Sequence, residues 1–316
     1  MNLIRLVLGS IFVAGCAGRG ISTSSSPTTL PAGAEAMSLL GKPLFAPELS
    51  AETRANFERH LAEARNAWEA SPNDPDAIIW LGRRTAYLGR YREAIRIYTE
   101  GISKHPMDAK LYRHRGHRYI TVRQFDDAIA DFTRAAELIR GKPDEIEPDG
   151  LPNARNIPTS TLQSNIWYHL GLAHYLKGDF EHALEAYREC MKVSTNPDML
   201  VATTNWLYMT LRRLDRFQEA AALLAPITRD MNLIENDSYH RLLLVYKGEI
   251  PAEAAVVSAS SDDRALDDAT LGYGVGNWHL YRGFRPQAHR IFERVLEGKS
   301  WAAFGYLAAE AEMSRK

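Results

Sequence analysis

The chain has 316 residues, of which 45% are hydrophobic and 24% charged, and this is the composition of a globular protein with a sizeable apolar core. Its formal net charge is −1 at pH 7, which excludes the strong overall positive field with which many proteins attract nucleic acid or an anionic membrane surface. We therefore expect no nucleic-acid partner.

The first fifteen residues have the pattern of an export signal. Arg5 precedes an apolar run over residues 6–14, which is too short to cross a bilayer, and the sequence Val-Ala-Gly-Cys ends the segment at Cys16. This ending resembles the lipobox of bacterial lipoproteins, in which the signal peptide is cleaved before a cysteine that receives the lipid. The resemblance implies a signal peptide over 1–15, lipidation of Cys16 and a place in the bacterial cell envelope. In a cell with two membranes, that place is the periplasmic face of the outer membrane.

Residues 16–49 are expected to form the lipidated cysteine and a flexible tether, because the stretch 17–36 is rich in Gly, Ser, Thr and Pro. Contact with a membrane is expected through this anchor only. The second cysteine is Cys190. With Cys16 lipidated, no disulfide is available within the chain, so packing alone is expected to hold the fold.

The remainder, residues 50–316, repeats a two-helix pattern every 34 residues. Three pairs of residues of similar size stand 34 positions apart: Gly82 and Gly116, Ala94 and Ala128, and Tyr98 and Phe132. The small residues allow the two helices of a unit to approach closely, and the aromatic residues fill the space between neighbouring units. A period of this length indicates a solenoid of stacked helix pairs.

These positions resemble the tetratricopeptide repeat (TPR) family, which implies an all-α fold, an α-solenoid of about six helix-turn-helix units. The units are expected near 75–108, 109–142, 164–197, 201–234, 235–268 and 269–302, of which 235–268 is degenerate. Helices that cap the array are expected before the first unit and after the last. Ser300 is the candidate N-cap of the final helix.

Family geometry also implies which side chains face the concave surface of the solenoid. The implied groove residues are Arg83, Tyr87, Arg113, His117, Asn165, Tyr168, Asn205, Arg212, Tyr273 and Asn277. Arginine, aromatic and amide side chains are common at protein-binding surfaces and at sites for carboxylates. Arg113 and His117 share one helix face, which is expected to line the groove, and Arg113 is expected to be at least partly solvated. The resemblance therefore implies a protein or peptide partner in the envelope.

An insertion over 141–163 interrupts the array, and four prolines disfavour a helix there. Long loops on a rigid scaffold often carry function, so Asn153, Arg155 and Asn156 are candidate binding residues in the loop. A surface insertion without a role is an equal alternative.

The stretch Arg-His-Arg-Gly-His-Arg-Tyr at 113–119 is a poor metal site, because arginines flank His114 and His117 and no acid or cysteine stands nearby. His174 is expected to be a buried structural histidine. No catalytic residue, metal or cofactor is expected. The sequence favours a non-enzymatic adaptor. Two alternatives remain, a small-ligand or catalytic site beneath the 141–163 loop and a structural spacer.

Overall fold

The computed structural model describes residues 30–256 and 264–315. Cys16, the signal peptide and the first part of the expected tether lie outside the described residues. The described chain forms fourteen helices and two short strands, an all-α helical-repeat structure with one small β-hairpin. None of its helices is both long and apolar enough to cross a membrane.

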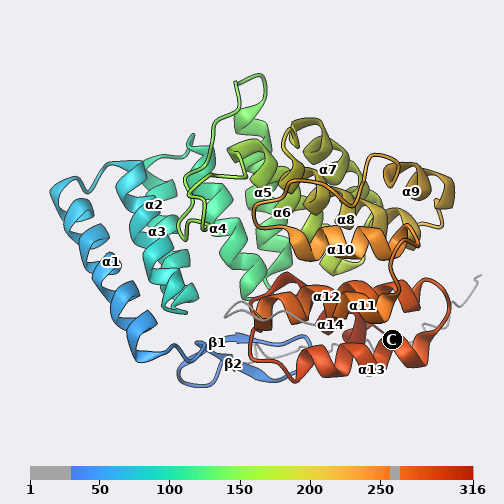
Figure 1. The fold of residues 1–316 in the computed structure, drawn as a ribbon. Coiled ribbons are helices and arrows are strands. Elements are labelled where there is room, and N and C mark those ends of the chain that lie inside the picture. The colour runs from blue at the N-terminus through green and yellow to red at the C-terminus, as the bar shows by residue number, and fades with distance from the viewer. Residues whose placement is uncertain (1–29, 257–263, 316) are drawn as a thin grey trace, which may run out of the picture.

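The helices follow one another in antiparallel pairs, close to the expected register (Figure 1). The pairs are α2 (Pro75–Tyr87) with α3 (Tyr91–Lys104), α4 (Ala109–Thr121) with α5 (Phe125–Ile139), α6 (Leu162–Lys177) with α7 (Phe180–Val193), α8 (Pro197–Arg213) with α9 (Phe217–Leu223), α10 (Asp237–Tyr246) with α11 (Ala252–Val256), and α12 (Arg264–Leu280) with α13 (Arg285–Leu296). Helix α1 (Ala51–Ala70) precedes this array and α14 (Phe304–Ser314) follows it.

Local sequence explains where the first units begin. Asp74 and Asp108 cap α2 and α4, and their carboxylates accept from backbone N–H groups at 3.0 and 2.8 Å. The turns between the paired helices use a left-handed residue, which is Gly89 (φ 77°) in the first unit and Arg123 (φ 66°) in the second. A left-handed backbone conformation is unusual for an arginine. The side chain of Arg123 contacts Trp301 and Glu310 near the end of the chain.

The expected small-residue contacts are confirmed. A Cβ atom on Gly82 would lie 2.3 Å from the ring of Tyr98, and one on Gly116 would lie 2.9 Å from the ring of Phe132. Ala94 in the first unit is completely buried, as are its counterparts Ala128, Ala183, Ala220 and Ala288, whereas Ala254 of the degenerate unit is exposed. Four units pack in this way, through the contact of a glycine on the first helix with an aromatic ring on the second, since Gly171 meets Tyr187 and Gly276 meets Phe292 in the same manner.

Residues 34–45 differ from the expected tether. Strand β1 (Ala34–Met37) pairs antiparallel with β2 (Pro43–Phe45), and Ala36 and Leu44 are buried in the main core. Alternate residues of β1 point inward, so one face of the hairpin packs on the helices. The flexible tether therefore does not extend through this part of 16–49.

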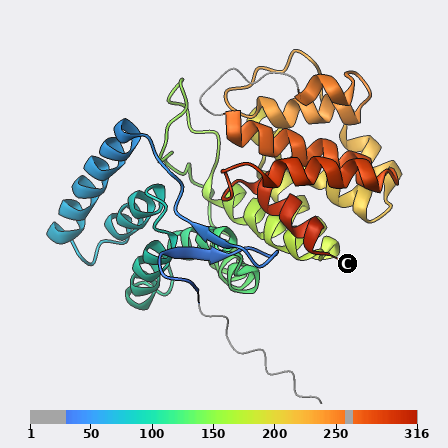
Figure 2. The ribbon, with the colours of Figure 1, turned by 90° about the horizontal axis from the view of Figure 1, so that it is seen from below.

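The array curves until its last helices reach the hairpin at its start (Figure 2). The indole N–H of Trp301 donates to the carbonyl of Phe45 at 2.7 Å, and its ring lies edge-on to Tyr91 with centroids 5.3 Å apart. Helix α14 begins at Phe304 with Ala303 at its N-cap, so the expectation of Ser300 as N-cap is wrong. Trp301 lies before this helix, where its contacts with Phe45 and Tyr91 join the end of the array to its beginning.

Candidate functional site

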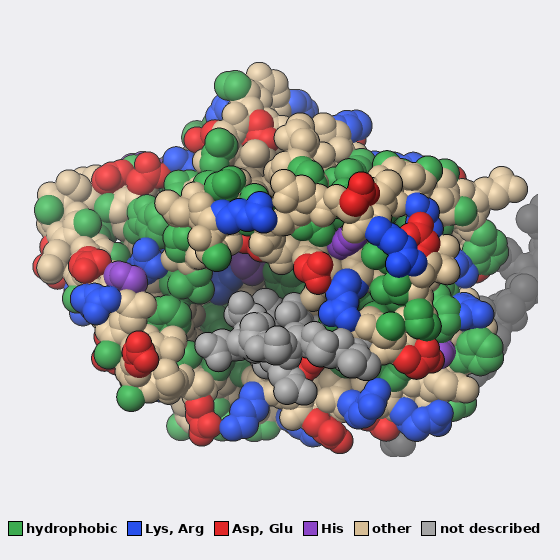
Figure 3. Space-filling view, viewed as in Figure 1, with side chains coloured by type: hydrophobic (Ala, Val, Ile, Leu, Met, Phe, Trp, Pro, Cys, Tyr) green, Lys and Arg blue, Asp and Glu red, His purple; other side chains and the backbone are tan. Residues whose placement is uncertain are grey.

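The first helices of the early units, α2, α4 and α6, lie side by side and bring several of the expected groove residues together. Figure 3 shows this side of the molecule hollowed at its centre, with basic and histidine side chains visible inside the hollow. Part of this surface is covered by the chain itself.

Glu147 of the insertion is seated on this surface. Its carboxylate oxygen Oε2 lies 3.0 Å from Nε of Arg113 and accepts from the amide Nδ2 of Asn165 at 3.1 Å. All three side chains are buried. Burial lowers the pKa of Arg113, and the charge of Glu147 opposes that shift. The expectation that Arg113 is partly solvated is wrong, because the insertion covers it.

His114 completes the seat as a neutral imidazole. Burial, followed by the charge of Arg113, lowers the pKa of His114 well below its usual value. Nη1 of Arg113 lies 3.0 Å from Nδ1 of His114, and Nε2 of His114 lies 3.3 Å from Oε1 of Glu147. A guanidinium always donates, so we assign the proton of His114 to Nε2. The ring then relays a hydrogen bond from the arginine to the carboxylate.

The backbone of the insertion directs Glu147 inward. Ile146 and Thr161 form an antiparallel bridge, and the N–H of Leu162 donates to the carbonyl of Glu145 at 2.9 Å. Successive residues of an extended chain point to opposite sides. Ile146 accordingly faces solvent at 69% exposure, whereas Glu147 faces the groove at 7%. This places a charged residue inside and an apolar one outside, which is the reverse of core packing.

The insertion also contacts the first unit. Nη1 of Arg84 donates to the carbonyl of Gly150 at 2.8 Å. A Cβ atom on Gly150 would lie 1.7 Å from the hydroxyl of Tyr87 and 2.8 Å from Nη2 of Arg83. The absence of a side chain at position 150 therefore lets the chain lie against these two groove residues without displacing them.

His117 and Tyr168 lie on the same side of the array but face other parts of the chain. The ring of His117 is 4.5 Å from that of His169 and 5.6 Å from that of Phe304 at the start of α14. Burial lowers the pKa of His117 well below its usual value and that of His169 to about 3, so both are neutral. The hydroxyl of Tyr168 donates to that of Tyr239 at 3.1 Å.

The expected groove does not continue into the later units. Asn205, Tyr273 and Asn277 are buried in the core, so they are not available to a partner. Tyr273 and Asn277 instead hydrogen-bond the hydroxyl of Tyr175, at 2.7 and 3.2 Å. These side chains are buried because the array curves. On its inner side, α12 packs against α10, and α14 packs against α6.

Arg212 is also held by the fold. It donates to the hydroxyl of Tyr208 at 3.0 Å, and its guanidinium lies 4.2 Å from the ring centre of Tyr281. These contacts fix its orientation against two aromatic side chains, away from the Glu147 seat on α4 and α6.

The loop candidates shape the tip of the insertion. Oδ1 of Asn153 accepts from the N–H groups of Arg155 and Ile157, at 3.1 and 3.3 Å, and Asn156 is left-handed with φ 51°. Arg155 reaches the side chain of Asn232 at 3.4 Å. The residue that enters the groove, Glu147, was not a candidate. The only signal for it was the acidic first half of the insertion, which matches the basic helix at 113–118.

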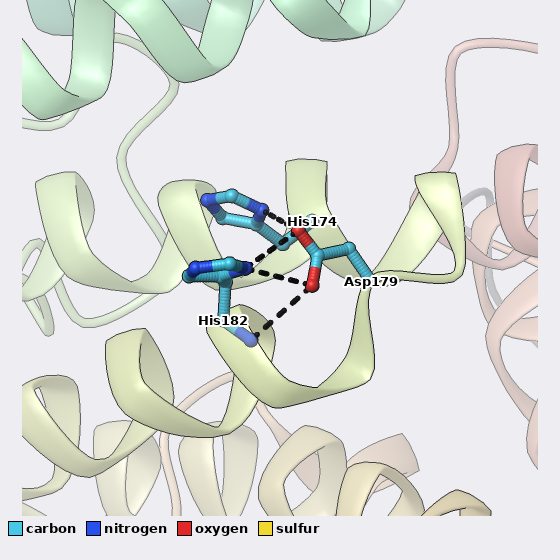
Figure 4. Close-up of side chains that lie close together, drawn as sticks. All are labelled: His174, Asp179 and His182. Carbon is cyan, nitrogen blue, oxygen red and sulfur yellow. Dashed lines mark hydrogen bonds and ion pairs between the residues drawn. The ribbon is translucent and has the colours of Figure 1, made fainter. Parts of the chain in front are cut away.

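One group of side chains has the composition of a metal site. Nδ1 of His174 lies 3.0 Å from Asp179, and Nδ1 of His182 lies 2.8 Å from both oxygens of the same carboxylate (Figure 4). Although burial opposes it, the bonds from His182 and His174 lower the pKa of Asp179, and Asp179 raises that of His182. Asp179 also caps α7. The group could not be read from the sequence, because His174 lies on α6, His182 lies on α7 and Asp179 lies in the turn between them.

Comparison with known proteins gives the following similarities. A family model for the tetratricopeptide repeat matches residues 164–196. The chain is 27% identical over 141 residues to BBSome complex member BBS4 of Bos taurus, which covers 45% of this chain and 23% of that protein. It is 27% identical over 137 residues to tetratricopeptide repeat protein 13 of Homo sapiens, covering 43% and 13%. The chain thus spans less than a quarter of the length of these relatives.

Solved structures of similar architecture include YrrB, described as a TPR protein with an unusual peptide-binding site. It has a TM-score of 0.42 and 14% identity, and the match covers 74% of this chain and 91% of that one. A tetratricopeptide repeat protein from Parabacteroides merdae has a TM-score of 0.47 and 13% identity, with 82% and 93% covered.

Proposed function

We propose that this chain, a tetratricopeptide repeat protein, is a non-enzymatic adaptor that binds an acidic, extended segment of a partner on its concave surface. Proteins built from these repeats mediate protein–protein interactions. The observation that carries the proposal is the seat of Glu147, where Arg113, His114 and Asn165 hold a carboxylate that an extended chain presents. The same chemistry would hold an acidic residue of another protein.

The charge around the seat supports an acidic partner. Arg83 and Arg118 lie over the rings of Trp80 and Tyr91, at 4.4 and 5.6 Å, and neither pairs with an acid within the described residues. Positive charge without an ion-pair partner among the described residues favours the approach of a negatively charged segment. The space beneath the insertion, where a small-ligand site was the alternative, contains the Arg113–Glu147 pair.

The proposal includes the location of the protein in the cell. The basic residue, short apolar run and lipobox-like ending at Cys16 support anchoring in a bacterial envelope, with membrane contact through the lipid alone. The partner would then be an envelope protein or a segment of one.

Site-specific photo-crosslinking in the native host tests the groove. A photoreactive residue replaces the half-buried Tyr87 in the full chain, and the control carries it at the exposed Lys192 on α7. We expect a partner adduct at 87 alone, which mass spectrometry maps to a segment containing Asp or Glu. Equal adducts at both positions, or a mapped segment without acidic residues, would contradict the proposal.

A further inference from the structure

We propose that residues 146–151 of the insertion are a built-in ligand that occupies the concave surface until an acidic segment of the partner displaces it. The displacement by a partner segment rests on the proposed function. On the chain's side it rests on how the insertion is attached, on a buried oxygen atom in it that accepts no hydrogen bond, and on the shape of its two contact points.

Polar contacts alone attach the insertion. Every apolar side chain between residues 143 and 158 is exposed, including Ile146 at 69%, Leu151 at 57% and Ile157 at 49%. A segment that stabilised the fold would bury such side chains, because apolar burial is the main favourable contribution to folding. Release of this segment from the groove therefore withdraws no apolar side chain of its own from the core.

Both ends of the insertion are fastened by hydrogen bonds that do not involve the groove. Oδ1 of Asp144 accepts from the N–H of Gln163 at 3.0 Å. At the other end, the hydroxyl of Thr159 donates to the carboxylate of Glu235. The backbone carbonyl of Thr159 accepts from Nδ2 of Asn196 at 2.8 Å. The stretch between these anchors, 146–151, is the part that reaches the groove. Its departure would break the bridge of Ile146 with Thr161 and the bond from the N–H of Glu147 to the carbonyl of Ser160 at 3.3 Å, but would leave both anchors in place.

The segment 146–151 buries a polar atom that has no hydrogen-bond partner among the described residues. Oδ2 of Asp149 is buried and accepts no hydrogen bond within residues 30–256 and 264–315. Burial, followed by the nearby charge of Glu235, raises the pKa of Asp149. An unpaired buried oxygen opposes the closed arrangement and so favours displacement.

The two contact points describe the competing segment. The first holds a carboxylate, that of Glu147. The second, three residues later, favours glycine, because a Cβ at position 150 would have to displace the side-chain ends of Tyr87 and Arg83, and its carbonyl receives the bond from Arg84. We therefore expect the partner segment to be an extended stretch with an acidic residue followed three positions later by a small residue, preferably glycine.

A fluorescein-labelled peptide of residues 143–151 is the probe, since it carries both contact points. The opened protein is the full chain with Glu147→Ala and Gly150→Val, which removes the internal occupant and leaves the groove residues unchanged. Wild type and Ile157→Ala, a change at the exposed tip, are the closed controls. A tethered ligand acts at an effective concentration on the order of millimolar. Fluorescence anisotropy should therefore show binding to the opened protein, and binding about 10–100-fold weaker to both controls.

Arg113→Glu in the opened background should abolish binding, and so should a probe with glutamine in place of the glutamate at position 147. No binding of the probe to an opened protein with native circular dichroism would overturn the inference, as would equal binding to opened and closed proteins. Hydrogen–deuterium exchange of the wild type gives a second measurement that needs no variant. Amides of 146–151 should exchange faster than those of 159–163, and equal protection would show a fixed structural loop.

The two proposals fail separately. Binding of the probe to the opened protein, together with a partner adduct away from Tyr87, would leave the internal ligand standing and remove the proposed function. A mapped acidic partner at Tyr87, together with no binding of the probe, would do the reverse.

Discussion

The side chains of Arg123 and Glu310, 187 residues apart in the chain, form an ion pair with an N–O distance of 2.5 Å and exposures of 3% and 1%. The same guanidinium donates to the carbonyl of Trp301 at 3.0 Å, and the other oxygen of Glu310 accepts from the N–H of Leu39. One carboxylate therefore joins the N-terminal hairpin, the second unit and the last helix. This explains why an arginine takes a left-handed turn position.

Glu310→Ala should destabilise the fold strongly, because it leaves the buried charge of Arg123 without a partner. Removal of one member of a buried pair costs about 3–5 kcal/mol. Urea unfolding measures the change. The control is Glu219→Ala, which removes the partner of Arg216 in an exposed pair and should change stability little. Similar losses in both variants would show that the closure contributes no more than a surface pair.

Ala128→Leu should overpack the second unit, because Ala128 is completely buried at the contact of α4 and α5. The expected loss is about 1–3 kcal/mol in the free energy of unfolding. Ala130, two residues later on the same helix, is exposed, so Ala130→Leu is the matched control and should be nearly neutral. Thermal or urea unfolding distinguishes them, and an unchanged midpoint for Ala128→Leu would contradict the packing described here.

Stability should fall as the pH is lowered from about 6.5, the ordinary histidine pKa. Burial lowers the folded-state pKa of His114, His117 and His169, the last to about 3. Below pH 6.5 the unfolded chain binds protons that the folded chain does not, so acid favours unfolding. Each histidine adds at most about 1.4 kcal/mol per pH unit to the slope.

The pH prediction is checked by urea unfolding between pH 7.5 and 5. His169→Asn keeps a side-chain N–H for the carbonyl of Asn165 and removes one titrating group, so it should reduce the slope. A slope unchanged by this substitution would show that His169 does not remain neutral in the folded state.

Cys16→Ala should prevent lipidation and leave an uncleaved precursor, since the cysteine is the proposed acceptor. Growth with radiolabelled fatty acid, followed by membrane fractionation, measures the effect. The buried Cys190 provides the control, because burial raises its pKa to about 11 and makes its thiol unreactive. Label in Cys16→Ala, or its loss in Cys190→Ala, would contradict the proposed anchor.

The sequence predicted the concave surface only in part. Arg83, Tyr87, Arg113 and Asn165 do meet around one site, because residues at equal positions of stacked units share a face. Asn205, Tyr273 and Asn277 occupy equivalent positions but are buried. The register of a unit does not reveal how tightly the array curves, and curvature decided which part of the inner face stays accessible.

The sequence by itself determined the repeat register. The caps at Asp74 and Asp108 and the contacts of Gly82 with Tyr98 and of Gly116 with Phe132 all lie within one unit, so local residues specify them. Tertiary structure alone decided the closure through Arg123 and Glu310 and the seating of Glu147 on Arg113. These contacts join distant segments, each through a few side chains gathered around one carboxylate. No periodic pattern marks them, so they form only once the packed units have set the distance between the segments.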